Sequence, residues 1–160
     1  MRIMPALSAI AFGLLLASAG AAKDRPRHCM LRVHAQANPR DTDVFATSVR
    51  AQLSGKDVAI EKMPWISERD VIAFSLYPAR DGTYGALLQL DEHGRVVLDT
   101  LSIERRGSFL FVFVNGRPIT ELEIDKRVSD GKLYIPSGLS AVDIDSMKRD
   151  WRLIGQKKKH

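Results

Sequence analysis

The sequence predicts an α+β fold in which a mostly antiparallel sheet carries two packed helices. Short segments of alternating or unbroken apolar residues, which are typical of strands, recur between turn signals along the chain. Two segments, Gly94–Arg105 and Ala141–Ile154, have helical spacing and follow good N-cap residues. In the C-terminal half the predicted order is β-α-β-β-β-α, and about four strands precede this unit.

The N-terminal strands are predicted from alternation and composition. Val44–Leu53 fits either one face of a strand or a short helix with Asp43 as its N-cap, and its Val, Phe and Thr content favours the strand. Val58–Lys62 is predicted as a short strand. Residues 28–36 alternate clearly, and their inward side is expected to consist of Cys29, Leu31, Val33 and Ala35.

A proline-led loop and a β-hairpin are predicted next. Pro64 breaks regular structure, and Ser67 is a good N-cap for one helical turn. Ile72–Tyr77 alternates as a strand, Asp81-Gly82 is a strong hairpin signal, and Tyr84–Leu90 is the partner strand.

The first helix and a buried strand follow this hairpin. Asp91 is a suitable N-cap, and Gly107 can end the helix in the left-handed conformation. Phe109–Val114 is an unbroken apolar run, so we expect a central strand that is covered on both faces. The apolar face of the helix is expected to consist of Val97, Leu98 and Leu101.

A second hairpin leads to a further strand. Asn115-Gly116 suits a type I′ turn, and Pro118 places the start of the return strand at a sheet edge. Asp130-Gly131 is another turn signal, and Lys132–Pro136 is predicted as a short strand after it.

The last helix has a clear start signal. Ser140 and Asp143 occupy the two positions of a capping box. Helical spacing predicts a buried face that consists of Ile144, Met147, Trp151 and Ile154.

The ends of the chain predict export. Residues 1–22 have the features of a secretory signal peptide: Arg2, an apolar run from Ala6 to Ala17, and a cleavage motif at Ala19-Gly20-Ala21. A retained N-terminal anchor is the alternative. We expect a single α+β domain at 23–154, a disordered basic tail at 155–160, and no membrane-spanning segment after cleavage. The expected location is the periplasm or the extracellular space.

Charge and cysteine content narrow the partners. The formal net charge is +5, but three positive charges lie in the tail at Lys157–Lys159. A basic face interleaved with aromatic residues is not recognisable, so a nucleic-acid partner is not expected. Cys29 is the only cysteine, which precludes an internal disulfide, and its place in the alternating segment favours burial.

The sequence contains no recognisable catalytic motif, so no catalytic, cofactor-binding or metal-binding residue is predicted. Asp91, Glu92 and His93 could form an acid–base cluster, but carboxylates at this position also suit a helix start, which is the favoured interpretation. His28 and His34 are expected to face solvent on one side of a strand.

Three arginines form the candidate partner-binding group. Arg105, Arg106 and Arg117 could converge at one end of the sheet and hold an acidic partner. Such runs of charge are more commonly solvated faces.

Structural positions between about residues 64 and 152 follow a family pattern. A proline-led loop ends in Asp70-Val71, a leucine-bearing strand meets a helix-opening glycine at Gly94, and an apolar strand breaks at Asn115-Gly116. Val128 then precedes Gly131 by a short spacer, ahead of a short strand and a capped helix. In these positions the segment resembles the head subdomain of the first periplasmic domain of SecD, an accessory subunit of the bacterial protein-export machinery.

The resemblance implies an α+β module that faces the exported side of the membrane and contacts passenger protein. SecD-like subunits also carry membrane helices with polar residues for proton-driven motion, and this sequence has no such segments. The leading hypothesis is therefore an exported, non-enzymatic protein-interaction module with a protein or peptide partner, needing no cofactor. Strand addition is expected at a sheet edge near Arg117–Ile119 or Met30–Gln36.

Two alternatives stay open. The first is a small exported hydrolase that acts on envelope material, which requires a concave pocket gathering at least two of Asp91, His93, Asp125 and Asp130. The second is binding of a polyanion or membrane surface by Lys157–Lys159.

Overall fold

The computed structural model describes residues 27–156, so the predicted signal peptide and Lys157–Lys159 lie outside the described residues. Within this range the chain forms ten strands, two α-helices and one 3₁₀ turn. The helical elements are η1 (Glu68–Asp70), α1 (Glu92–Glu104) and α2 (Ala141–Asp150). The strands are β1 (Leu31–Ala35), β2 (Ala46–Arg50), β3 (Asp57–Glu61), β4 (Ile66–Ser67), β5 (Val71–Pro78), β6 (Tyr84–Leu90), β7 (Phe109–Val114), β8 (Arg117–Glu123), β9 (Lys132–Leu139) and β10 (Arg152–Leu153).

The strands form two four-stranded sheets and a separate hairpin. The first sheet has the order β4-β1-β7-β8, the second has the order β10-β5-β6-β9, and β2 pairs only with β3. Every strand pairing is antiparallel except that of β10 with β5. The predicted α+β class with mostly antiparallel strands is confirmed, although the strands divide into two sheets where the sequence suggested one.

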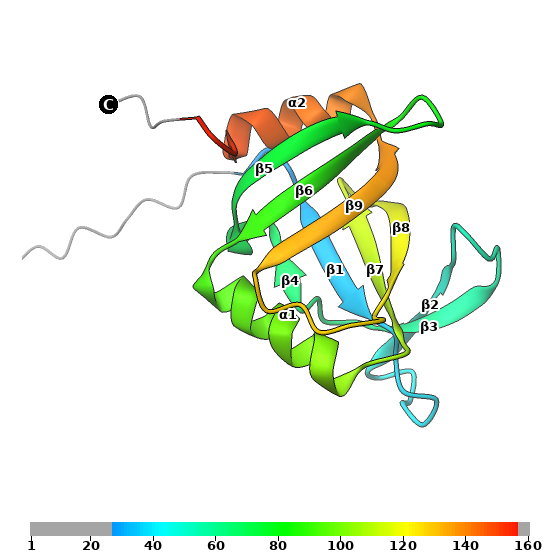
Figure 1. The fold of residues 1–160 in the computed structure, drawn as a ribbon. Helices are drawn as coiled ribbons and strands as arrows, with labels where there is room; N and C mark the ends of the chain where they lie inside the picture. The colour runs from blue at the N-terminus through cyan, green and yellow to red at the C-terminus, as the bar shows by residue number, and fades with distance from the viewer. Residues whose placement is uncertain (1–26, 157–160) are drawn as a thin grey trace, which may run out of the picture.

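The two sheets share one hydrophobic core. Val33 and Val112 of the first sheet and Phe74 and Leu88 of the second are each at most 1% exposed and belong to the same buried cluster. Figure 1 shows β5, β6 and β9 in front of β1 and β7, with α1 and α2 at opposite ends of the body. Both helices contribute to this core, and burying each leucine-sized side chain contributes about 1.5–3 kcal/mol.

The start of α1 agrees with the sequence prediction. The Asp91 side chain accepts a hydrogen bond from the Gly94 N–H at 2.8 Å, as an N-cap does. Leu98 and Leu101 are buried, and Val97 packs partly against the core. Gly107, with φ of +83°, lies just beyond the helix end, in the conformation that glycine adopts most easily.

Strand β7 is central and covered on both faces, as predicted. It pairs with β1 on one side and with β8 on the other. Its residue Phe111 points away from the main core and packs with Ala51 and Ile60 of the β2–β3 region. The hairpin prediction after β7 is also confirmed, because Asn115 and Gly116 have φ values of +51° and +78°.

The end of α2 differs from the prediction. The helix has the expected capping box at Ser140 and Asp143 but ends at Asp150, and Ile154 is 44% exposed rather than on a buried face. The backbone becomes extended at Trp151, whose ring contacts Phe74 with centroids 6.2 Å apart. The chain then pairs with β5 as β10, because the strand edge offers hydrogen bonds that a longer helix could not make.

Candidate functional site

Strand β8 is an outer strand of the first sheet and β9 an outer strand of the second, and the two lie next to each other. Among the described residues, β8 pairs only with β7 and β9 only with β6. They touch at one end, where a Cβ on Gly138 would lie 2.9 Å from the carbonyl oxygen of Ile119. Residues 124–131 connect the two strands and run along α1 (Figure 1).

A cleft of about 680 Å³ lies where these outer strands and their connection meet, and we call it the edge cleft. Its apolar lining comes from four elements, α1, β7, β8 and β9, which contribute Leu98, Leu110, Leu122 and Leu133. Leu87 and Tyr134, which are cross-strand neighbours on the outer face of the second sheet, extend this lining. The cleft therefore joins an unpaired strand edge to an apolar floor.

The connection that walls the edge cleft is fixed to α1 and β6. The Val128 N–H donates to Ser102 Oγ at 2.9 Å, and the Leu90 N–H donates to the Gly131 carbonyl at 2.8 Å. Arg127 forms a two-pronged ion pair with Asp99, at 2.6 and 2.8 Å, which lowers the pKa of that carboxyl. The cleft wall is thus held at several points along its length.

Of the two strand edges expected to bind a partner, only the one near Arg117–Ile119 lies at a sheet edge, because β8 is an outer strand. Met30–Gln36 is not a free edge, because β1 lies between β4 and β7 and Gln36 bridges to Ile60. At the start of β8, Arg117 and Pro118 are exposed, whereas Ile119 is buried against Gly138, and strand addition there stays a prediction. A further accessible edge is the first part of β9, beginning at Lys132, inside the edge cleft.

The three candidate arginines do not converge at one end of the sheet. Arg105 and Arg106 precede β7, whereas Arg117 follows it after a tight turn, so the strand separates them. Arg105 donates to Glu61 Oε1, and Arg117 donates to Asp143 Oδ2. Their binding of an acidic partner stays a prediction.

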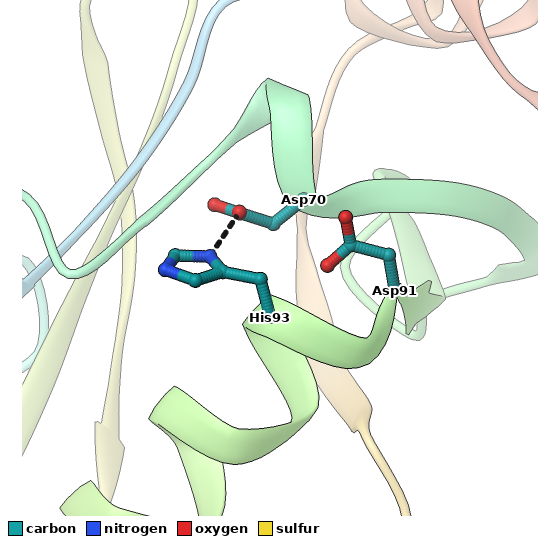
Figure 2. Close-up of side chains that lie close together, drawn as sticks. All are labelled: Asp70, Asp91 and His93. Carbon is teal, nitrogen blue, oxygen red and sulfur yellow. Dashed lines mark hydrogen bonds and ion pairs between the residues drawn. The ribbon is translucent and has the colours of Figure 1, made fainter.

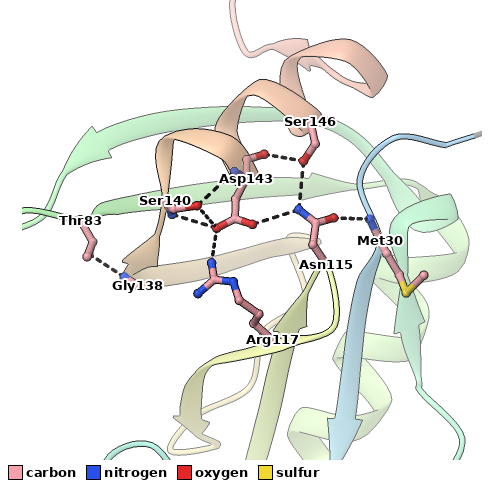
Figure 3. Close-up of polar contacts among 8 residues, drawn as sticks. All are labelled: Met30, Thr83, Asn115, Arg117, Gly138, Ser140, Asp143 and Ser146. Atoms are coloured by element: carbon pink, nitrogen blue, oxygen red, sulfur yellow. Dashed lines mark hydrogen bonds and ion pairs between the residues drawn. The ribbon is translucent and has the colours of Figure 1, made fainter.

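Arg117 belongs to a polar network that ties the β7–β8 turn to α2 (Figure 3). Asp143 is 2% exposed; its Oδ2 accepts bonds from the Ser140 N–H and hydroxyl at 2.9 and 2.6 Å, and its Oδ1 accepts from Asn115 Nδ2 at 2.9 Å. Burial alone would raise the pKa of Asp143, but the hydrogen bonds from Ser140 and Asn115 and the charge of Arg117 hold that pKa below its usual value. The sequence indicated the capping box but not the contacts across the fold.

A second polar cluster lies at the start of α1 (Figure 2). His93 Nδ1 lies 2.8 Å from Asp70 Oδ1, and this hydrogen bond and the Asp70 charge raise the pKa of the imidazole. Asp91 caps the helix as predicted, whereas Glu92 pairs with Arg95 and takes no part in the cluster. Sequence spacing could not reveal the contribution of Asp70, because the whole β5–β6 hairpin separates it from Asp91 and His93 along the chain.

The other histidines and the cysteine have ordinary structural surroundings. His28 is exposed and bonds Asp150, as a solvent-facing residue can. His34 is half-buried rather than solvent-facing, because its Nδ1 lies 2.8 Å from the Glu61 carbonyl and its ring contacts Phe113 edge-on. Cys29 is buried as predicted, and burial raises the pKa of its thiol to about 11.

The pocket criterion for a hydrolase, at least two of the four named residues in one cleft, is met. Asp125 and Asp130 both line the edge cleft, but Asp91 and His93 do not. Asp130 is engaged with Lys132, whose N–H donates to its Oδ1 at 3.1 Å. The cleft therefore gathers two carboxylates, without a histidine in its described lining.

Comparison with known proteins gives a structural likeness. No protein-family model and no curated protein sequence matches the chain. A solved structure of SecDF, reported as a membrane component that enhances protein export, is similar with a TM-score of 0.53 and 15% identity over 84% of this chain and 70% of that one. A second structure, SecDF in a super-membrane-facing form, has a TM-score of 0.52 and 16% identity over 80% of this chain and 20% of that one.

The likeness supports an SecD-like fold for this chain, in agreement with the resemblance seen in the sequence. Among the described residues, neither helix is long and apolar enough to cross a membrane.

Proposed function

We propose that this chain, which has an SecD-like fold, is an exported, non-enzymatic module that holds extended segments of unfolded or envelope proteins. The observation that carries the proposal is the edge cleft, where the unpaired edge of β9 lies beside an apolar floor. The predicted signal peptide at 1–22 supports a periplasmic or extracellular location.

The edge cleft suits a polypeptide that adds as a strand alongside β9. An added strand lies about 4.8 Å from its neighbour and turns alternate side chains to one face. On the inner face those side chains meet Leu110, Leu122 and Leu133. Pro136 lies in β9 where the pairing with β6 is irregular, and proline, which has no N–H to pair, is tolerated in edge strands and at such bulges.

The expected affinity is modest. Each added backbone hydrogen bond contributes about 0.5–1.5 kcal/mol, and one buried leucine-sized side chain about 1.5–3 kcal/mol. Ordering the peptide costs part of this gain, so dissociation constants of about 10 µM to 1 mM are expected. Such weak binding suits a module that must release its partner.

Chemical-shift mapping tests the proposal. An unfolded, apolar peptide of alternating Val, Thr and Leu should shift the amide resonances of Lys132–Tyr134 and Leu122. Leu122→Glu, which places a charge in the cleft, should weaken binding at least about tenfold. The matched control is Val142→Glu on the exposed surface of α2, where Val142 is 75% exposed, and it should bind as the wild type does. Absence of any shift at millimolar peptide would refute the proposal.

The hydrolase alternative has one observation in its favour, the presence of Asp125 and Asp130 in the same cleft. Paired carboxylates can act as acid and base when their environments differ. Incubation with purified envelope polymers, followed by detection of released fragments, tests this. Activity that is lost in both Asp125→Asn and Asp130→Asn would favour the hydrolase over the binding module.

A further inference from the structure

We propose that Asp70, Asp91 and His93 bind a divalent transition-metal cation of the Zn²⁺ class at the junction between η1 and α1. Each residue offers one ligand atom, and these atoms all lie within 4.8 Å of one another. The site is separate from the edge cleft, so it does not depend on the proposed function.

The donor set suits such a cation. Imidazole nitrogen and carboxylate oxygen are both common Zn²⁺ ligands, with bonds of about 2.0–2.2 Å. Ligand atoms around a tetrahedral Zn²⁺ ion are consequently about 3.3 Å apart. His93 Nδ1 and Asp70 Oδ1 are already 2.8 Å apart, so small side-chain rotations would accommodate an ion between them and Asp91.

The backbone around the site holds the two carboxylates in place. The Asp91 N–H donates to the Asp70 carbonyl at 2.7 Å, which fixes the two residues side by side. A Cβ on Gly94 would lie 3.0 Å from Asp70 Cβ, so α1 begins in close contact with Asp70. Preorganised ligands of this kind reduce the conformational cost of binding.

Other hydrogen bonds orient the carboxylates and leave an oxygen of each toward His93. Asp70 Oδ2 accepts from the Ser67 N–H at 2.7 Å, and Asp91 Oδ1 accepts from the Gly94 N–H at 2.8 Å. Within residues 27–156, Asp91 Oδ2 accepts no hydrogen bond, and Figure 2 shows this carboxylate turned toward the space between Asp70 and His93. In metal sites, hydrogen bonds from neighbouring groups to the ligand side chains fix the orientation of those side chains.

Charge at the site favours a cation. With the imidazole neutral, as it must be to bind a metal ion through nitrogen, the two carboxylates carry a charge of about −2, and the adjoining start of α1 contributes only about +0.5 through its dipole. The neighbouring Arg95 is paired with Glu92 and does not neutralise them. The His93 side chain is 71% exposed, which gives an ion a path from solvent and room for water as a further ligand.

Two variants remove a metal ligand while preserving the hydrogen bonds that stabilise the start of α1. Asp91→Ser keeps an N-cap acceptor but removes a ligand, and His93→Gln keeps a hydrogen-bond donor for Asp70 but removes the imidazole. His28→Gln is the control, because it removes an exposed histidine that lies outside the site and hydrogen-bonds Asp150.

Calorimetric titration of the metal-free protein with ZnCl₂ provides the test. The wild type and His28→Gln should bind one ion with a dissociation constant below about 100 µM, and each site variant should bind at least about tenfold more weakly. In the wild type, Co²⁺ should also shift or broaden the amide resonances of His93 and Gly94, which requires no variant to fold. Absence of wild-type binding, unchanged binding in either site variant, or Co²⁺ effects located elsewhere would overturn the proposal.

Discussion

The carboxylate of Asp143 connects α2 to the turn between β7 and β8. It is buried, yet it accepts hydrogen bonds from Ser140, Asn115 and Arg117. Burying an ionised carboxylate without such partners costs free energy, so these hydrogen bonds are what allow Asp143 to be buried in its charged form. The consequence is that the stability gained from Asp143 requires its ionised form.

The first prediction concerns Asp143→Asn. Hydrogen bonds to a charged group contribute about 1.5–3 kcal/mol, so the variant should lose about 1–3 kcal/mol of unfolding free energy at pH 7. Because the folded-state pKa of Asp143 lies below the unfolded value of about 3.9, this contribution is present above pH 4 and is lost as the pH falls through the folded pKa. Urea unfolding from pH 7 to pH 2.5 should show the difference from wild type shrinking at the acid end.

The control for this prediction lies on the same turn of α2. Asp145 is exposed, and Asp145→Asn should change stability by less than about 0.5 kcal/mol at every pH. A difference between Asp143→Asn and wild type that stays constant down to pH 2.5 would contradict the assigned role of the charge.

At the scale of elements, the second sheet depends on one close approach between β5 and β6. Tyr77 lies opposite Gly85, and its ring stacks on Tyr134 with centroids 5.3 Å apart. A Cβ on Gly85 would lie 2.1 Å from a ring carbon of Tyr77. The absence of a side chain at Gly85 is thus what lets the tyrosine ring cross β6 to reach β9.

The second prediction follows from this contact. Gly85→Ala should displace the Tyr77 ring and cost about 1–3 kcal/mol of unfolding free energy, as overpacking does. In a Tyr77→Ala background the same substitution should cost less than about 0.5 kcal/mol, because the clashing ring is gone. Denaturant unfolding of the four proteins in this double-mutant cycle measures the coupling, and additive effects would disprove it.

Elements with local signals were predictable from the sequence. The bounds of β6, the N-caps at Ser67 and Asp91, and the capping box of α2 all agree with expectation, because neighbouring residues determine them. The end of α2 was not predictable, since the pairing of β10 with β5 depends on a strand that is distant in the sequence. The same reason explains why one sheet was expected where two occur.

The candidate sites were less predictable than the elements. The edge cleft exists because β8 and β9 become the outer strands of different sheets, which no local pattern encodes. Asp91 and His93 were recognised as a cluster, but Asp70 joins them only when η1 packs on α1. Arg105 and Arg117, which the sequence suggested could converge, lie at opposite ends of the intervening strand β7.

At the scale of the whole molecule, the two sheets share one core, so we expect them to unfold as one cooperative unit. The main core contains residues of both sheets and both helices, so neither sheet keeps its apolar face covered alone. Trp151 is buried in this core beside Phe74 of the second sheet. Trp65 packs against the same core, next to β4 of the first sheet. The two tryptophans therefore report on different sheets of the same core.

The third prediction uses these tryptophans as separate probes. In Trp65→Phe the fluorescence reports Trp151, and in Trp151→Phe it reports Trp65, because the chain has two tryptophans. Within each variant, the urea midpoint from fluorescence should coincide with the midpoint from far-ultraviolet circular dichroism, as two-state unfolding requires. The variants will differ from each other in stability, since Trp65 Nε1 donates to Glu61 at 2.6 Å whereas Trp151 fills the core. Separate midpoints within one variant would mean that the sheets unfold independently, and the edge cleft between their outer strands would then not be a rigid feature.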